Sequence, residues 1–155
     1  MRAVVVILIT GGALAALSVP QQETIMTVKR LTPIIFVAEI EPCLPFWTER
    51  LGFERTAEVP HDDRLGFVIL QKDGTELMYQ SVAGAVADFP PLAAHAERSS
   101  STLFVEVVDV EAVAERLAGV EVVRPMRTTS YGARELFVRA PCGTVVGFAQ
   151  FGAGE

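Results

Sequence analysis

The sequence has few of the residues on which metal and thiol chemistry depend. Its 155 residues include two cysteines, Cys43 and Cys142, and two histidines, His61 and His95. Two cysteines make neither a disulfide framework nor a metal cluster. A Gly-rich phosphate loop, a Ser-centred elbow and a CxxC pair are also absent from the sequence. These absences exclude the protein classes that are defined by such patterns.

Positive charge is also scarce. The chain has 13 Lys and Arg against 19 Asp and Glu, which gives a net charge of −6 and a pI near 5.0. A nucleic-acid partner would require a basic face, so none is expected, and neutral or cationic ligands are mildly favoured. With 50% hydrophobic and 21% charged residues, the chain fits one globular domain with a sizeable core.

The first 30 residues read as an extension that lies outside the domain. A basic start followed by the apolar run 3–19 resembles a secretory signal with a cleavage site near Ser18. The run is short for a bilayer and is interrupted by two glycines at 11 and 12, so no stable membrane span is expected.

A second interpretation of the same segment places the start of translation at Met26. Gln22 and Glu23 can be encoded by a ribosome-binding sequence, and Met26 follows at a short distance. We favour this start because the segment has no counterpart in the repeat described next. It predicts a cytoplasmic protein, whereas a true signal peptide would predict an exported one.

The rest of the chain contains an internal repeat. Segment 64–80 reads RLGFVILQKDGTELMYQ and segment 134–151 reads RELFVRAPCGTVVGFAQF. Phe67 and Phe137 are 70 residues apart, and so are Gln80 and Gln150. At the same spacing, residues 32–41 match residues 102–111. A single duplication of this length predicts a domain of two paired modules and not a solenoid.

Each half has the order strand, helix, strand, strand, strand. The β-branched and aromatic runs predict strands at 31–37, 54–60, 65–71 and 75–80, and again at 102–107, 120–126, 134–138 and 145–151. Helices are expected from Glu41 to Gly52 and over 110–117. Residues 31–81 and 101–151 are therefore the two modules. Residues 82–100 form a linker, with a short helix after Pro91.

Burying one apolar face of each module predicts an α+β fold. The two βαβββ modules would form a curved, cup-like mixed sheet with the helices outside. The inside of the cup is then the expected ligand site.

The duplication and three segments resemble the vicinal-oxygen-chelate superfamily. The segments are FWTERLGFE at 46–54, DGTELMYQ at 73–80 and VRAPCGTVVGFAQ at 138–150. This superfamily includes glyoxalase I, bleomycin-resistance proteins, fosfomycin-resistance enzymes and extradiol dioxygenases. The resemblance spans Leu31 to Phe151 and implies the same cup-shaped fold.

In metal-using members, four cup-facing positions supply His, Gln or Glu to a divalent ion. The resemblance places those positions at Thr32, Glu76, Thr102 and Gly147. Of these, Glu76 alone is a good ligand, whereas catalytic sites usually need three protein ligands. We therefore expect no metal and no other cofactor, although a displaced metal site is the alternative.

The register of the last strand is left open by the sequence. Matching the terminal glutamines would align Glu76 with Val146 in place of Gly147. A shift of one residue turns a side chain to the other face of the sheet.

Strand alternation predicts which other side chains line the cup. Glu76 and Glu106 either bind a ligand or pair with Arg134 or Arg139, and Tyr131 either caps the pocket or packs against the domain. Phe46 and Trp47 are expected in the core, and Cys43 is expected to be an inert thiol more than a nucleophile. The predicted ligand-binding set is Thr32, Ile34, Phe36, Glu76, Met78, Gln80, Thr102, Phe104, Glu106, Tyr131 and Arg134.

The function predicted from these observations is metal-independent binding of a small cationic or amphipathic molecule. The resemblance points to the bleomycin-resistance type, which implies a homodimer. The alternative is a metal-dependent lyase or isomerase of the glyoxalase type, or a dioxygenase relative. Threonines 32 and 102, at positions where histidines would be expected, favour the binding protein.

Overall fold

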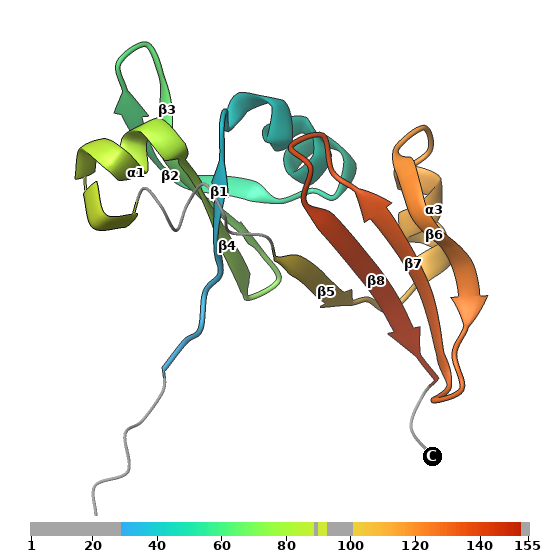
Figure 1. The fold of residues 1–155 in the computed structure, drawn as a ribbon. Coiled ribbons are helices and arrows are strands. Elements are labelled where there is room, and N and C mark those ends of the chain that lie inside the picture. The colour runs from blue at the N-terminus through green and yellow to red at the C-terminus, as the bar shows by residue number, and fades with distance from the viewer. Residues whose placement is uncertain (1–28, 89, 93–100, 153–155) are drawn as a thin grey trace, which may run out of the picture. The chain divides into compact units, whose positions relative to one another are not determined.

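A computed structural model describes residues 29–88, 90–92 and 101–152 of the chain. From Thr32 onwards the chain forms one unit that contains two four-stranded sheets (Figure 1). Residues 1–28 of the predicted extension, and His95, lie outside the described residues. No helix of the described residues has both the length and the apolar character that crossing a membrane requires.

The first sheet contains β1 (Ile34–Val37), β2 (Glu54–His61), β3 (Arg64–Lys72) and β4 (Thr75–Ser81). Their order is β1-β4-β3-β2, with β1 parallel to β4 and the other pairs antiparallel. The turn between β3 and β4 consists of Asp73 and Gly74, which both have positive φ. Such a two-residue turn fits the twist of a hairpin, as the Asp-Gly pair predicts.

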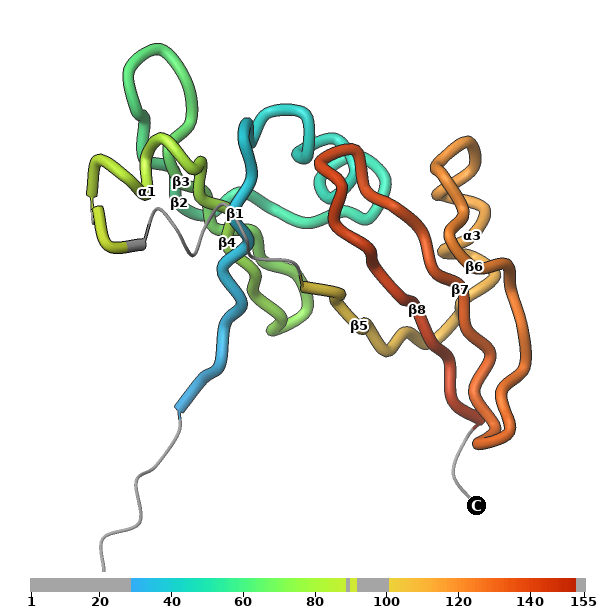
Figure 2. Tube along the Cα trace, in the orientation of Figure 1, coloured from blue at the N-terminus to red at the C-terminus, as the bar shows by residue number. Residues whose placement is uncertain are grey.

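The second sheet repeats this arrangement. It contains β5 (Thr102–Glu106), β6 (Glu121–Thr128), β7 (Ala133–Arg139) and β8 (Val145–Phe151), in the order β5-β8-β7-β6. Again the outer strand β5 is parallel to its neighbour β8. Figure 2 traces the backbone through both halves. The predicted duplication of a βαβββ module is therefore confirmed.

The helices are shorter and less regular than predicted. The first helical segment consists of a 3₁₀ turn, η1 (Glu41–Cys43), and a π-helical segment, η2 (Phe46–Arg50). The second is α3 (Val110–Arg116), whose first turn is capped by Asp109, which accepts from the backbone N–H of Ala112 at 2.9 Å.

The linker prediction missed a helix. Helix α1 (Val82–Asp88) begins directly after β4, before the 3₁₀ turn η3 (Pro90–Leu92). The hydroxyl of Ser81 accepts from the backbone N–H of Gly84 at 3.0 Å, which caps the helix. A Cβ at Gly84 would lie 3.1 Å from the carbonyl oxygen of Gly66, so the glycine serves close packing on β3 and does not mark a loop.

The core lies on one side of each sheet. Along β3 and β4, residues 68, 70, 77 and 79 are buried, whereas their neighbours in sequence are half-buried. The indole N–H of Trp47 donates to the hydroxyl of Tyr79 at 2.8 Å, and the Trp47 ring packs edge-on against Phe46 and Phe53. The prediction that Phe46 and Trp47 belong to the core is confirmed.

Polar contacts of two side chains join the modules. Arg50 donates to the backbone oxygens of Arg116 and Ala118, at 3.1 and 2.8 Å. The thiol of Cys142, in the turn between β7 and β8, lies 3.7 Å from the hydroxyl of Tyr79. The face of each sheet that lies opposite the core is left for other contacts.

We predict that Tyr79→Phe lowers the free energy of unfolding by about 1–3 kcal/mol, because it leaves the buried Trp47 N–H without its acceptor. Urea unfolding at constant pH measures the change. The double variant Trp47→Phe/Tyr79→Phe is the control, and its loss should be smaller than the sum of the single losses. Additive losses would show that the hydrogen bond contributes nothing.

Candidate ligand-binding site

The first sheet places six of the predicted site residues on one face. Ile34 lies beside Met78, and Phe36 beside Gln80, in the parallel pairing of β1 and β4. The hydroxyl of Thr32 donates to Glu76 Oε1 at 2.9 Å, and Gln71 Nε2 donates to Glu76 Oε2. Two neutral donors thus hold the Glu76 carboxylate on this face.

The second sheet presents a row of side chains that crosses all four strands. Phe104 on β5 lies beside Gly147 on β8, Gly147 beside Phe137 on β7, and Phe137 beside Arg124 on β6. Phe104 is 52% exposed, and its ring centroid lies 6.4 Å from that of Phe137. The guanidinium carbon of Arg124 lies 5.3 Å from the Phe137 ring centroid, within the range of a cation–π contact.

Gly147 lies under the ring of Phe137. A Cβ at this position would be 2.5 Å from the ring, so any side chain here would require the ring to move. Val146 is fully buried and therefore faces the core. Gly147 is thus the residue of β8 that shares a face with Phe104, which favours the register taken from the resemblance over the one taken from the terminal glutamines.

The four positions that carry metal ligands in the resembling proteins do not fit a divalent ion here. Thr32 is already hydrogen-bonded to Glu76, Thr102 is an exposed hydroxyl, and Gly147 has no donor and no room for one. His61 ends β2, 3.9 Å from Asp62, in the hairpin. Among the described residues, no three His, Cys, Asp or Glu side chains gather into a possible metal site.

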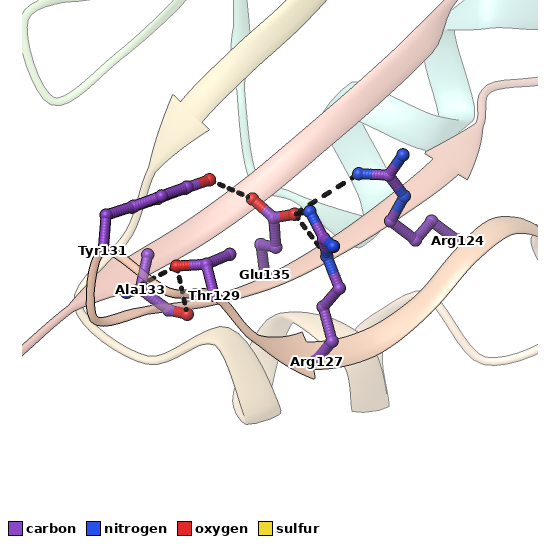
Figure 3. A network of polar contacts seen from close by, with 6 residues as sticks. All are labelled: Arg124, Arg127, Thr129, Tyr131, Ala133 and Glu135. Carbon is purple, nitrogen blue, oxygen red and sulfur yellow. Dashed lines mark hydrogen bonds and ion pairs between the residues drawn. The ribbon is translucent and has the colours of Figure 1, made fainter.

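A buried carboxylate on the second sheet was missed by the sequence analysis. The side chain of Glu135 is only 2% exposed, although it lies on the same face as Phe137. Figure 3 shows three side chains that converge on it. Arg127 donates through Nε at 2.8 Å and Nη2 at 2.6 Å to Oε1, Arg124 Nη1 lies 3.6 Å away, and the Tyr131 hydroxyl donates to Oε2 at 2.8 Å.

These partners change the acidity of the network. The hydrogen bond from Tyr131, followed by that from Arg127, lowers the pKa of Glu135, so the carboxylate stays ionised in spite of its burial. The same hydrogen bond raises the pKa of the Tyr131 phenol. Glu135 is therefore an anion that holds two guanidinium groups on the face.

An irregularity in β6 explains why this network was missed. Arg124 and Arg127 are three residues apart, and in a regular strand they would point to opposite faces. The pairing of β6 with β7 shifts register between them, so both approach Glu135. Pro125 lies between the two arginines, and proline occurs in strands mainly at edges and bulges. Pro125 was therefore the residue in the sequence that could have indicated this irregularity in β6.

The structure does not bring Arg134 to the other predicted site residues. Arg134 pairs with Glu111 of α3, because neighbouring residues of β7 point to opposite faces and Glu135 takes the site face. Arg139 pairs with Glu121 at 3.1 Å. The sequence left open a pairing of Arg134 or Arg139 with Glu76 or Glu106. In the structure both arginines instead pair with other carboxylates. Tyr131 is held by Glu135, with its ring 6.3 Å from that of Phe151.

Cys43 has the properties of an inert thiol, as the sequence analysis favoured. It is fully buried and its Sγ lies 3.6 Å from the carbonyl oxygen of Glu39, to which it donates. A hydrogen bond with Cys142 and burial both raise the pKa of Cys43. A thiol held in its protonated form is a poor nucleophile.

A cavity of about 550 Å³ lies apart from all the predicted site residues. The arginines that line it are occupied, Arg50 by backbone oxygens and Arg139 by Glu121 and the carbonyl of Gly143. Its lining residues are Pro42, Pro45, Phe46, Arg50, Gly119, Val120, Glu121, Arg139, Ala140, Pro141 and Gly143.

Comparison with protein families shows to which family the chain belongs. Residues 27–148 match the model of the Glyoxalase/Bleomycin resistance protein/Dioxygenase superfamily, and the chain belongs to this family. No curated protein matches the sequence.

Solved structures show the same fold at low sequence identity. TioX from Micromonospora sp. ML1 is 17% identical with a TM-score of 0.65, over 79% of this chain and 98% of that chain. TnmS3, an antibiotic binding protein from Streptomyces sp. CB03234, is 23% identical with a TM-score of 0.61, over 82% and 99%. A lactoylglutathione lyase from Agrobacterium tumefaciens is 14% identical with a TM-score of 0.65, over 80% and 95%.

We predict that the Glu135 carboxylate contributes to acid sensitivity. Its pKa is lowered in the folded state, so its contribution to stability is present above the unfolded-state pKa of about 4.3 and is lost as the pH falls through the folded-state pKa. Glu135→Gln should therefore be less stable than the wild type at neutral pH and should lose less stability on acidification.

Thermal melts between about pH 6 and pH 3 measure this difference. Glu58→Gln is the matched control, because Glu58 is half exposed and pairs with Arg55 on the surface. Parallel pH profiles for the wild type and Glu135→Gln would contradict the assignment.

Proposed function

We propose that this protein binds a small amphipathic molecule on the open faces of its sheets without a metal ion. The observation that carries the proposal is the Phe137 ring that lies over Gly147. It puts an aromatic surface where metal-using relatives would need a donor. Phe104, Ile34 and Met78 supply further apolar surface for a ligand, and Glu76 supplies a polar group.

The comparisons support a member of this family but leave two classes of function. Their similar structures include both an antibiotic binding protein and a lactoylglutathione lyase. The donor set of this chain supports a choice between them. One carboxylate and two threonine hydroxyls are weak ligands for a catalytic divalent ion, so we favour binding over metal-dependent lyase, isomerase or dioxygenase chemistry.

Metal content tests this proposal. Protein purified from medium with ordinary trace metals should carry less than one equivalent of Zn, Ni, Mn or Fe per chain, by native mass spectrometry and elemental analysis. A chelator should leave the melting temperature unchanged, because the four family positions hold no ion. One equivalent of metal that is lost in Glu76→Gln, together with a lower melting temperature after chelation, would overturn the proposal.

We also propose a homodimer. Apolar side chains that the proposed ligand surface does not use are exposed on the outer strands, with exposed fractions of 53% for Val59 on β2 and 52% for Val122 on β6. Apolar patches of this kind commonly mark interaction surfaces, and a second copy would shield part of them.

Light scattering coupled to size-exclusion chromatography tests the dimer. The wild type should elute at twice the chain mass at micromolar concentration, and Val59→Glu should shift the equilibrium towards monomer by about tenfold or more, since it places a charge in an apolar contact. Val108→Glu makes the same change in a loop where the side chain is already exposed, and should leave the dimer intact. A monomeric wild type would refute the dimer.

A further inference from the structure

The geometry of the second sheet points to a subsite for a planar aromatic anion, with the aromatic ring on Phe104 and Phe137 and the anionic group on Arg124. This inference rests on the proposed function, because it names the ligand chemistry of one of the same faces. It differs from the cationic ligand that the overall charge and Glu76 suggested.

The apolar part of this subsite consists of two neighbouring rings that are tilted by 48° to each other. Phe137 can lie across β8 because Gly147 has no side chain, and Phe104 stands beside it with half of its surface exposed. Because Gly147 and the Arg124 guanidinium lie against the Phe137 ring, an aromatic ligand would stack on the exposed Phe104 ring and meet Phe137 at its edge. The sheet thus supplies one exposed aromatic face beside the edge of a second ring, which favours an aromatic ligand.

The charged part is a positive group that stands beside these two rings. Arg124 and Arg127 together with the single carboxylate of Glu135 leave an excess of one positive charge. Arg127 uses its Nε and one Nη on Glu135, whereas Arg124 approaches the carboxylate through one nitrogen only, at 3.6 Å. An arginine has five N–H donors, so Arg124 retains donors for a carboxylate.

Neighbouring groups hold Arg124 in place. The guanidinium of Arg124 stacks on the Phe137 ring, and the buried carboxylate of Glu135 attracts this guanidinium. Because these contacts order the side chain before a ligand arrives, less rotamer freedom is lost on binding. Glu135 is therefore a positioning residue in this scheme and does not touch the ligand.

At the opposite edge of this face, strand β5 carries a negative charge. Glu106 on β5 is exposed and lies beside Ala149, which separates it from Glu135. A ligand carboxylate would be repelled there and attracted to Arg124. The distribution of charge across the sheet therefore sets the orientation of the aromatic anion as well as its affinity.

Three naphthalene probes of similar shape test the inference. These are 2-naphthoate, the neutral 2-naphthalenemethanol and the cationic 2-naphthylmethylammonium, measured by isothermal titration calorimetry and by ligand-observed NMR on the full chain. For the wild type, 2-naphthoate should bind about tenfold more tightly than the neutral alcohol, and the ammonium more weakly than both.

Arg124→Gln should reduce the affinity for 2-naphthoate by about tenfold and leave the affinity for the alcohol unchanged, because only the anion uses the guanidinium. Arg55→Gln removes one positive charge from a surface pair on the first sheet and is the matched control, with 2-naphthoate binding retained. Phe104→Ala should weaken both probes equally, since both stack on the ring.

The outcomes separate this inference from the proposed function. If the alcohol or the ammonium binds the wild type as tightly as 2-naphthoate, the anion subsite is wrong and metal-free binding of small molecules stands. The same holds if Arg55→Gln weakens 2-naphthoate as much as Arg124→Gln does, because the effect would then be one of net charge. If no probe binds, the subsite is refuted, and the metal measurement alone decides the proposed function.

Discussion

The buried contact between Trp47 and Tyr79 determines which faces of this fold are available for binding. The indole N–H donates to the Tyr79 hydroxyl in the interior, and the same hydroxyl lies against Cys142 of the other module. Residues 68 and 70 of β3 and residues 77 and 79 of β4 accordingly face the core. The alternate residues, Glu76, Met78 and Gln80 among them, are turned to the opposite face, because side chains along a strand alternate.

On the second sheet the same alternation buries a charged side chain. Glu135 is almost fully buried, and an isolated carboxylate in such a place would be strongly unfavourable. Its two arginines and one tyrosine hydroxyl offset this cost and are themselves fixed by it. Order on this face therefore comes from a buried charged network, whereas on the first face Thr32 and Gln71 donate hydrogen bonds to Glu76.

Most of the fold could be predicted from the internal repeat. Phe67 and Phe137 are 70 residues apart, and this spacing reflects two sheets with the same strand order, although the structure favours the register that does not match Gln80 with Gln150. Helix α1 was missed because Gly84 reads as a loop signal in a sequence. Its close approach to Gly66 depends on tertiary packing, which no local pattern reveals.

Alternation predicted the faces of the side chains well where strands are regular and poorly where they are not. Thr32, Glu76 and Phe104 follow simple alternation and lie where it places them. Arg124 and Arg127 depend on the register shift in β6, so alternation assigns them to different faces. Arg134 was chosen for its charge, but its neighbour Glu135 occupies the site face.

The Phe137 ring over Gly147 also bears on how many ligands one chain can hold. A duplicated module begins with two equal faces, each able to take the same compound. By strand pairing, Ile69 and Met78 take the places of Phe137 and Gly147 on the first sheet, and the rings of that sheet, Phe36 and Phe67, both lie beside Gln80 and not beside a glycine. A ring that lies over a glycine is therefore a feature of the second sheet, so the two faces differ, and the proposed subsite would take one aromatic anion per chain and not two.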